Sequence, residues 1–390
     1  MGSNSRPFII DADSHVEEGE NVWAHLDDSY TSRRPMIVER PIRPGEPALD
    51  KVWLIDGHTF PNYNGRAPSV MGTPVTSAFA KSKPFSIESQ SLTPPEARIA
   101  DLDKAGIDVQ VLFPTVFLIQ LTPDPGLEAA LMRSYNTWLA ETCARFPERL
   151  KWVATTPVRS PAAAVEEMRR TKALGAVGAQ IHGTGGDAML HDAQFDPIWA
   201  EAEALNMPIA VHTGWTMPSL HSKMDSIYAS VTLSAVPTMF GLFSFVGGGI
   251  LDRFPRLRVG LFEAGADWLP YLVPRMERYF GVYDNLNWPG LPKGRPSDYF
   301  VAGNIYLACE GDERALPQVA EILGEDHLMT SADMPHEEAL EDSIKHVQDR
   351  PDLSVSLKAK ILNENAARFY GFCPRLARGL FFSSRRKSSK

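Results

Sequence analysis

Imidazole and carboxylate side chains follow several short apolar runs in this chain of 390 residues. Asp13 and His15 are two positions apart, and alternate residues of an extended segment point to the same side. His212 and Asp333 each end a later apolar run. Imidazole nitrogens and carboxylate oxygens together suit one divalent ion, with Zn2+ expected first and Mn2+ as the other candidate. We therefore predict a mononuclear metal site with the ligands Asp13, His15, His212 and Asp333.

Two further carboxylates belong to the same runs. Asp11 leaves an alternative open, because it could stabilise a turn or replace Asp13 as a ligand. Glu263 follows the apolar residues Val-Gly-Leu-Phe. A buried carboxylate must be paired, protonated or catalytic, since unpaired burial costs several kcal/mol, about 2 or more. We predict that Glu263 is a catalytic acid or base and that Asp333 shares this role. The alternative is that Glu263 is a fifth ligand.

Three more residues are candidates for binding the substrate. His182 ends an apolar run and is expected to orient the substrate, with packing in the core as the alternative. Trp215 follows His212 closely and would stack an aromatic substrate or fill the core. His336 lies three residues after Asp333, where it would hydrogen-bond the substrate or support Asp333 from behind.

The elements that position these residues are predicted from eight short, near-continuous apolar runs, typical of strands buried on both faces of a parallel sheet. Helical periodicity separates most of them, which favours an α/β fold of the (β/α)8 TIM-barrel type, with a doubly wound open sheet as the alternative. In such a barrel, functional side chains lie at the carboxyl ends of the strands. The runs are Pro7–Asp13, Val109–Pro114, Lys151–Pro157, Val177–His182, Pro208–His212, Arg258–Glu263, Asn304–Cys309 and His327–Asp333.

Three of the connecting helices have recognisable ends. A T-x-x-E capping box from Thr93 to Glu96 is expected to begin one helix, which Gly106 ends. Ser160 and Pro161 are expected to begin a second helix, and residues 197–205 form a third.

Two segments interrupt this regular order. Residues 24–93 are rich in Pro, Gly and Ser, and a short hairpin is expected over residues 51–60. We interpret 24–93 as an insertion after the first strand that serves as a lid or an oligomer contact, or else as a surface excursion. Residues 373–390 are basic and are expected to form a flexible tail. Residues 1–372 are then a single domain.

The composition of the chain disfavours several classes of binding partner. The net charge of −9 disfavours nucleic acid, because phosphate backbones need clustered Lys and Arg. Three widely spaced cysteines without a C-x-x-C pair indicate a reduced, cytoplasmic setting. No apolar run approaches the length that spans a bilayer, so we expect no membrane association. A small molecule remains as the expected partner.

The chain resembles the amidohydrolase-related family, which includes aminocarboxymuconate-semialdehyde decarboxylase, resorcylate-type decarboxylases and some carbon–carbon bond hydrolases. The likeness extends from about residue 10 to residue 372. It rests on DADSHV at 11–16, RIADLDKAGIDVQVLFPT at 98–115, PIAVHTG at 208–214, FEAGADWLPYLVPRMER at 262–278, SADMPH at 331–336 and NENAARFYGF at 363–372. The resemblance implies the same four metal ligands and a homodimer. The sequence departs from the family at Glu263, where many of its decarboxylases have a catalytic histidine.

This departure leads us to expect hydrolysis of a C–C or C–N bond next to a carbonyl of a small substrate, with an aromatic molecule as one candidate. In this reaction Glu263 takes a proton from a water activated by the metal and later delivers it to the leaving atom. One alternative is non-oxidative decarboxylation of an aromatic or muconate-like acid, for which Glu263 would have to be protonated. Another is a barrel that binds a partner without catalysis.

Overall fold

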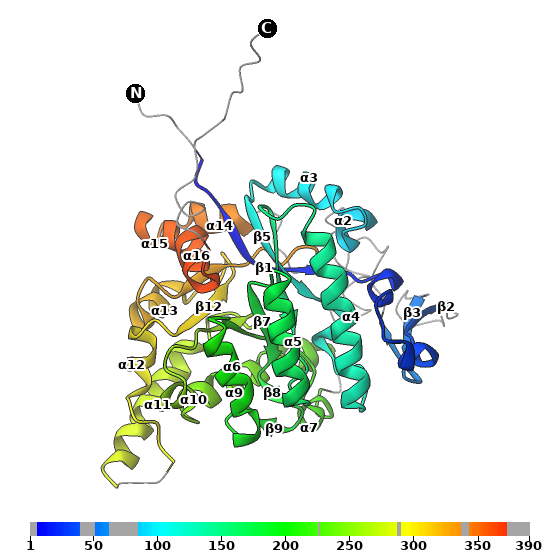
Figure 1. The fold of residues 1–390 in the computed structure, drawn as a ribbon. Coiled ribbons are helices and arrows are strands. Elements are labelled where there is room, and N and C mark those ends of the chain that lie inside the picture. Colours follow the sequence, from blue (N-terminus) through cyan, green and yellow to red (C-terminus); the bar gives the residue numbers. More distant parts are fainter. Residues whose placement is uncertain are drawn as a thin grey trace.

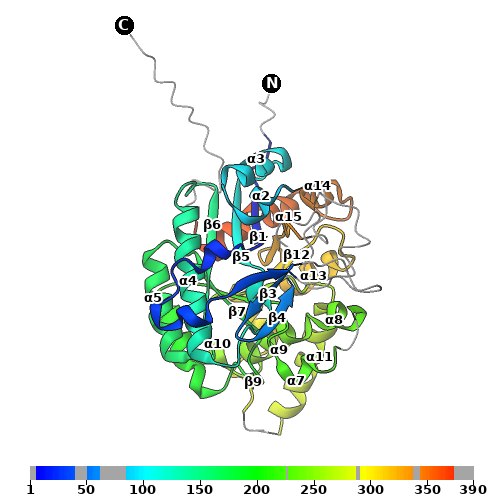
Figure 2. The same cartoon turned by 90° about the vertical axis from the view of Figure 1, so that its right-hand side faces the viewer.

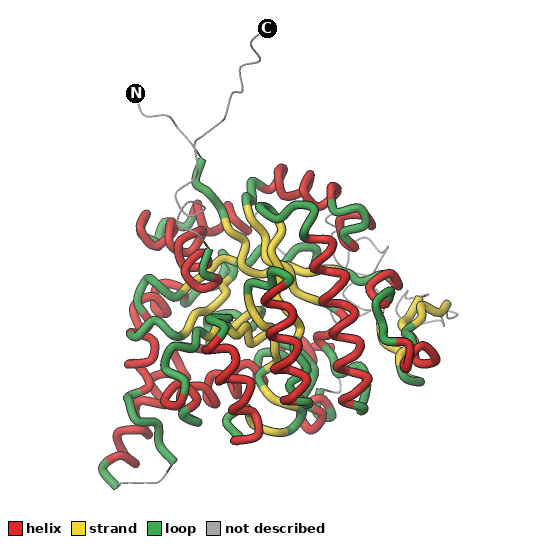
Figure 3. Tube along the Cα trace, viewed as in Figure 1, coloured by secondary structure: helices red, strands yellow, loops and turns green. Residues whose placement is uncertain are grey.

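The computed structural model describes residues 6–39, 51–61, 85–224, 227–286, 290–336 and 343–372. Eight parallel strands form one sheet in the order β1-β5-β6-β7-β10-β11-β12-β13, curled into a nearly closed barrel with helices around it (Figures 1 and 3). The predicted (β/α)8 fold is thereby confirmed. The strands are β1 Ile10–Val16, β5 Val109–Pro114, β6 Leu150–Thr155, β7 Gly178–His182, β10 Ile209–His212, β11 Val259–Phe262, β12 Ile305–Cys309 and β13 Leu328–Thr330.

The predicted runs match these strands in order, with ends that differ by up to three residues. The larger differences are at β1, which continues three residues beyond Asp13, and at β13, which ends three residues before Asp333. Asp333 therefore lies on the loop after its strand, whereas Asp13 and His15 are on the strand itself.

The helices have the following bounds: α2 Ile87–Ser91, α3 Glu96–Ala105, α4 Pro125–Cys143, α5 Pro161–Ala173, α6 Asp196–Ala204, α7 Pro218–His221, α8 Ile227–Leu233, α9 Val236–Val246, α10 Ile250–Arg253, α11 Leu269–Asp284, α12 Pro296–Val301, α13 Leu316–Leu323, α14 Ser343–Asp349, α15 Val355–Ala359 and α16 Asn365–Tyr370. No helix in the described part of the chain combines the length and apolarity needed to cross a membrane. Long helices such as α4 and α5 pack on the outside of the sheet (Figure 1).

The predicted start of α3 is wrong. The helix begins at Glu96 after Pro95 and has no side-chain cap, and the Thr93 hydroxyl instead donates to the Ser91 carbonyl. A local side-chain to backbone bond has replaced the expected capping box. The predicted end is correct, since Gly106 has a φ of 71°, a left-handed conformation suited to glycine.

Hydrophobic side chains pack on both faces of the barrel sheet. Inside it, residues such as Val111, Phe113 and Phe262 pack against one another from different strands. Outside it, a larger cluster that includes Trp199 and Phe245 fills the space between the strands and the helices. Alternate residues of each buried strand supply the two layers, so strand ends are fixed in position from both faces.

Asp11 joins β1 to both neighbouring segments. Its Oδ2 accepts from the Ser14 hydroxyl at 2.6 Å and from Gln110 Nε2 on β5 at 2.8 Å. Its Oδ1 accepts from the backbone N–H groups of Ala332 at 2.9 Å and Asp13 at 3.2 Å. Burial raises the pKa of Asp11 to about 6. Of the two roles considered for Asp11, the structure shows the hydrogen-bonding one.

The insertion contains more regular structure than the sequence predicted. The hairpin expected over residues 51–60 is present as β3 Lys51–Ile55 and β4 His58–Pro61, and β2 Met36–Glu39 adds a third antiparallel strand. Figure 2 shows this small sheet, in blue, in front of the barrel. Arg33 pairs with Asp56 in the turn between β3 and β4 at 2.7 Å. It also pairs with Asp124, the N-cap residue of α4, at 2.6 Å, which links the segment to that helix. Residues 40–50 and 62–84, and the predicted tail at 373–390, lie outside the described residues.

Replacing Asp11 tests how the barrel is closed. Asp11→Ala removes the acceptor of buried donors on three segments, so we expect a loss of about 2–4 kcal/mol in the free energy of unfolding. Urea denaturation measures this, with Asp28→Ala at an exposed position as the control. Equal midpoints for the two variants would show that Asp11 does not hold the closure together.

Candidate metal centre

Asp13, His15 and His212 meet at the carboxyl end of the barrel, and all three are fully buried. Asp13 Oδ1 lies 3.7 Å from His15 Nε2 and 3.5 Å from His212 Nε2. The two imidazole rings stand edge to face, with centroids 5.0 Å apart. Residues nearly 200 positions apart in the sequence thus present one oxygen and two nitrogens to a common point.

Hydrogen bonds to the backbone define the tautomer of both histidines. His15 Nδ1 lies 3.0 Å from the Pro114 carbonyl, and His212 Nδ1 lies 3.0 Å from the Thr213 carbonyl. A carbonyl can only accept, so each Nδ1 carries the proton and each Nε2 presents a lone pair. Burial, followed by the neighbouring His336 and His212, holds the pKa of His15 well below its usual range, which keeps this ring neutral.

Glu263 completes the cluster from the end of β11. Its Oε2 is 2.9 Å from His15 Nε2 and 3.2 Å from His212 Nε2. Its backbone has a φ of 48°, a left-handed conformation that non-glycine residues rarely adopt and that tends to occur at functional sites. This conformation turns the carboxylate toward the two imidazoles, so Glu263 is placed as closely as the predicted ligands are.

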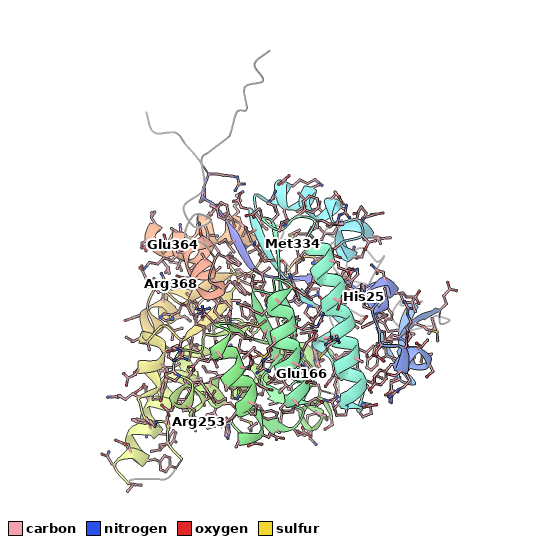
Figure 4. The ribbon with its side chains drawn as sticks, in the orientation of Figure 1. His25, Glu166, Arg253, Met334, Glu364 and Arg368 are labelled. Atoms are coloured by element: carbon pink, nitrogen blue, oxygen red, sulfur yellow. The ribbon has the colours of Figure 1, made fainter. Side chains whose placement is uncertain are left out.

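Asp333 approaches from the loop after β13. Its Oδ1 lies 3.6 Å from His15 Nε2, and its backbone also has a φ of 48°. The backbone pairs with β1, because the Asp333 N–H donates to the Asp13 carbonyl at 3.0 Å. This bond sets the two carboxylates side by side. Figure 4 labels the next residue, Met334, in the upper part of the barrel.

His336 contacts Asp333 rather than the centre of the cluster. Its Nδ1 lies 2.9 Å from Asp333 Oδ1, and its Nε2 lies 3.0 Å from the Thr115 hydroxyl. Glu17 Oε1 is 3.9 Å from the same Nε2. His336 is fully buried, and burial holds its pKa well below the usual range. The neutral ring donates from Nδ1 to Asp333 and accepts the Thr115 hydroxyl at Nε2.

Arg98 contacts the backbone and side chains that hold this cluster in place. It was not among the site residues predicted from the sequence. It is fully buried, and burial lowers its pKa to about 10. Its guanidinium donates to the carbonyls of Ser89 and His15 and to the side chain of Gln110, which in turn donates to Asp11. Apart from the quoted RIADLDKAGIDVQVLFPT motif, no local signal marks Arg98 or Thr115, since their partners come from distant segments.

His182 and Trp215 lie beside the cluster and not in it. His182 Nε2 is 2.8 Å from the Phe117 carbonyl, and burial lowers the pKa of this ring to about 4. Trp215 is 7% exposed and packs against Leu118 and Met224, while its indole N–H has no hydrogen-bond partner among the described residues. Both residues are placed by backbone contacts of the loops after β5 and β10.

The residues of the cluster fit a cation. Both oxygens of Asp13 and the Nε2 atoms of His15 and His212 are buried and make no hydrogen bond in the described structure. Lone pairs that face one another in this way repel unless a positive charge lies between them. Ligand atoms of Asp13, His15, His212 and Glu263 all lie within 4.8 Å of one another, and so do those of His15, Glu263, Asp333 and His336. Nitrogen and oxygen donors without a thiolate suit Zn2+ or Mn2+.

The fold and the site together define a (β/α)8 barrel with buried histidines and carboxylates at its carboxyl end. The amidohydrolase family model matches residues 55–372, and the chain belongs to this family. Gamma-resorcylate decarboxylase of Rhizobium sp. (strain MTP-10005) is 28% identical over 296 residues, which cover 70% of this chain and 86% of the relative. The 2-amino-3-carboxymuconate-6-semialdehyde decarboxylase of Dictyostelium discoideum is 24% identical over 286 residues, 72% of this chain and 77% of the relative.

Solved structures share the fold. An amidohydrolase from Mycobacterium avium subsp. paratuberculosis K-10 superposes with a TM-score of 0.78 at 20% identity, covering 95% of this chain and 99% of that chain. A dihydroxybenzoic acid decarboxylase from Polaromonas sp. JS666, solved with manganese and 2-nitroresorcinol, has a TM-score of 0.63 at 21% identity and covers 94% and 97%.

These comparisons confirm the predicted relationship to the amidohydrolase-related decarboxylases and support an enzymatic role. They agree better with decarboxylation, which the sequence suggested as an alternative, than with hydrolysis, which it favoured. The expectation of hydrolysis depended on one residue, Glu263. The similarity to the decarboxylases covers most of the chain.

Removing a ligand tests the centre directly. We expect about one equivalent of divalent metal per chain by elemental analysis, and loss of most of it in Asp13→Asn and His212→Gln. His191→Gln, at a part-buried histidine hydrogen-bonded to Ser244, is the control. Because burial lowers the pKa of His15, the metal should be retained below a pH of about 6.5, where free imidazole becomes protonated. Full metal content in both ligand variants would refute the site.

Proposed function

We propose that this protein is a metal-dependent, non-oxidative decarboxylase of a small aromatic acid. The observation that carries the proposal is the buried set of two unprotonated imidazole nitrogens facing carboxylates, in a chain whose relatives are named decarboxylases. The reaction breaks the bond between a ring carbon and its carboxylate and places a proton on that carbon. One proton is consumed and one CO2 is released for each substrate.

Asp13, His15 and His212 would hold the cation, together with Asp333 or Glu263. A divalent ion bound there would supply a Lewis acid for the substrate carboxylate. We expected Zn2+ first, but the related decarboxylase solved with manganese favours Mn2+. Because the tautomers of His15 and His212 are fixed by backbone hydrogen bonds, the lone pairs of their Nε2 atoms are already available to a metal ion. The two rings therefore need little reorganisation when the ion binds.

Of the two predicted acids, we propose that Asp333, in its protonated form, delivers the proton to the ring carbon. Its Oδ1 accepts from His336 Nδ1, and Thr115 holds the far side of that ring. His336 thus acts through Asp333 as a positioning residue, which was one of the two roles considered for it. The short distances from Glu263 Oε2 to both imidazole nitrogens support a role for Glu263 as a further ligand in this proposal, rather than as the acid.

Hydrolysis is a second candidate, and Glu263 is the observation that favours it. A carboxylate beside the cation could take a proton from water and return it to a leaving atom. Decarboxylation ranks above hydrolysis because the two relatives named decarboxylases match 70% and 72% of this chain. A homodimer, a cytoplasmic location, a single domain over 1–372 and a lid function for 24–93 stay predictions.

Decarboxylation is assayed by CO2 release from hydroxybenzoates, including 2,6-dihydroxybenzoate, by manganese-loaded protein. Asp333→Asn should lower kcat at least about 100-fold, the usual contribution of a general acid. Asp312→Asn on the loop after β12 is the matched control. Hydrolysis of amides or 1,3-diketones without CO2 release from any of these acids would favour the second candidate, and a fully active Asp333→Asn would exclude Asp333 as the proton donor.

Glu263→Gln separates the two roles of Glu263. If Glu263 is a ligand, metal affinity should fall by about tenfold or more together with turnover. If it is only an acid or base, turnover should collapse while metal content is unchanged. Titration of metal-free protein with Mn2+, read by calorimetry, gives the answer independently of any substrate.

A further inference from the structure

A short segment, residues 263–268, leads from the end of β11 to the start of α11 and carries Glu263 into the metal centre. Its backbone is left-handed at two positions, with a φ of 48° at Glu263 and of 62° at Gly265. A non-glycine residue keeps such a conformation only where surrounding contacts determine it. The contacts that hold this segment therefore decide where the Glu263 carboxylate lies.

Glu313, on the segment between β12 and α13, binds the backbone that follows Glu263. Its Oε2 accepts from the N–H group of Ala266 and from that of Asp267, the latter at 3.1 Å. Its Oε1 accepts from the N–H group of Glu310 at 2.7 Å. One carboxylate thus joins the loop after β11 to the loop after β12.

Asp267 makes the same type of contact in the opposite direction. Its Oδ1 accepts from the Ala315 N–H at 2.8 Å, and its Oδ2 accepts from the Arg314 N–H at 3.3 Å. The indole N–H of Trp268 donates to the Gly265 carbonyl at 2.8 Å. Side chains, rather than the sheet, therefore hold the peptide groups that follow Glu263.

The Glu313 carboxylate has partners that explain why an acidic residue stands at this position. Within the described residues, these partners are backbone N–H groups rather than a Lys or Arg side chain. Burial raises the pKa of Glu313 to about 7, so the carboxylate lies where few other groups would solvate it. Ala266 is fully buried, and its N–H could not turn to water if this acceptor were removed.

We propose that Glu313 is a positioning residue for the metal centre. It holds the backbone of residues 263–267 so that the Glu263 carboxylate stays beside the Nε2 atoms of His15 and His212. Groups that orient a ligand commonly change metal affinity even though they do not touch the ion. The inference rests on the proposed role of Glu263 as a further ligand, and Glu313 acts through that residue alone.

The test is a double-variant cycle, read by calorimetric titration of metal-free protein with Mn2+. Glu313→Ala should weaken Mn2+ binding about tenfold, as expected when a group that orients a ligand is lost. The double variant Glu313→Ala with Glu263→Gln should bind Mn2+ as weakly as Glu263→Gln alone, because the two residues act as one unit. A direct effect of the Glu313 charge on the ion would persist without the Glu263 carboxylate, and the two losses would then multiply.

Glu277→Ala is the matched control. This carboxylate on α11 also accepts from a backbone N–H of another segment, that of Ser297 at 2.6 Å, but it is not part of the cluster. The control should lower the melting temperature without changing Mn2+ affinity. Glu313→Gln keeps one acceptor oxygen and should lose less affinity than Glu313→Ala. If the alanine variant does not fold, the same cycle is run with Glu313→Gln.

Three results would overturn the proposal: unchanged Mn2+ affinity in Glu313→Ala, an equal loss of affinity in Glu277→Ala, or losses that multiply in the double variant. The cycle measures metal binding and not turnover. A lack of CO2 release from hydroxybenzoates would therefore count against the proposed function and leave the result for Glu313 standing.

Discussion

The candidate site depends on the repulsion between buried imidazole lone pairs and carboxylate oxygens that face one another. His15 and His212 each use Nδ1 to donate to a backbone carbonyl, which leaves the lone pair of Nε2 directed at carboxylate oxygens. In water such groups would be solvated, but here they are buried in the barrel. Leaving the Nε2 atoms of His15 and His212 and the oxygens of Asp13 buried without a hydrogen-bond partner costs about 2 kcal/mol or more per group. A bound cation would turn each repulsive contact into an attractive one, and this charge balance is the basis of the metal site that we propose.

The closure of the barrel is what brings these atoms together. The loop after β13 pairs with β1 through the Asp333 N–H and the Asp13 carbonyl, and Asp11 receives donors from both segments and from β5. The left-handed backbone at Glu263 and Asp333 aims their carboxylates inward. Such strain persists only where the surroundings determine the conformation. The hydrogen bonds that close the barrel therefore also preorganise the candidate ligands.

Much of this arrangement could be predicted from the sequence because it follows from periodicity. Eight apolar runs identify the strands, and the rule that functional groups lie at their carboxyl ends places Asp13, His15 and His212 together. Their roles as ligands remain a prediction that metal analysis decides. Hydrogen bonds between distant segments could not be predicted. Thr115, Arg98 and Gln110 meet the site only in three dimensions, and the choice of Thr93 for a backbone carbonyl over a helix cap depends on local geometry.

The central claim is that one cation lies between Asp13, His15 and His212. Anomalous diffraction from crystals grown with manganese tests it most directly, because the signal locates the ion without any assumption about the reaction. The account predicts one strong peak within coordinating distance, about 2.0–2.3 Å, of Asp13, His15 and His212. A map with no peak there, or with the ion bound elsewhere while these side chains keep their present contacts, would contradict it.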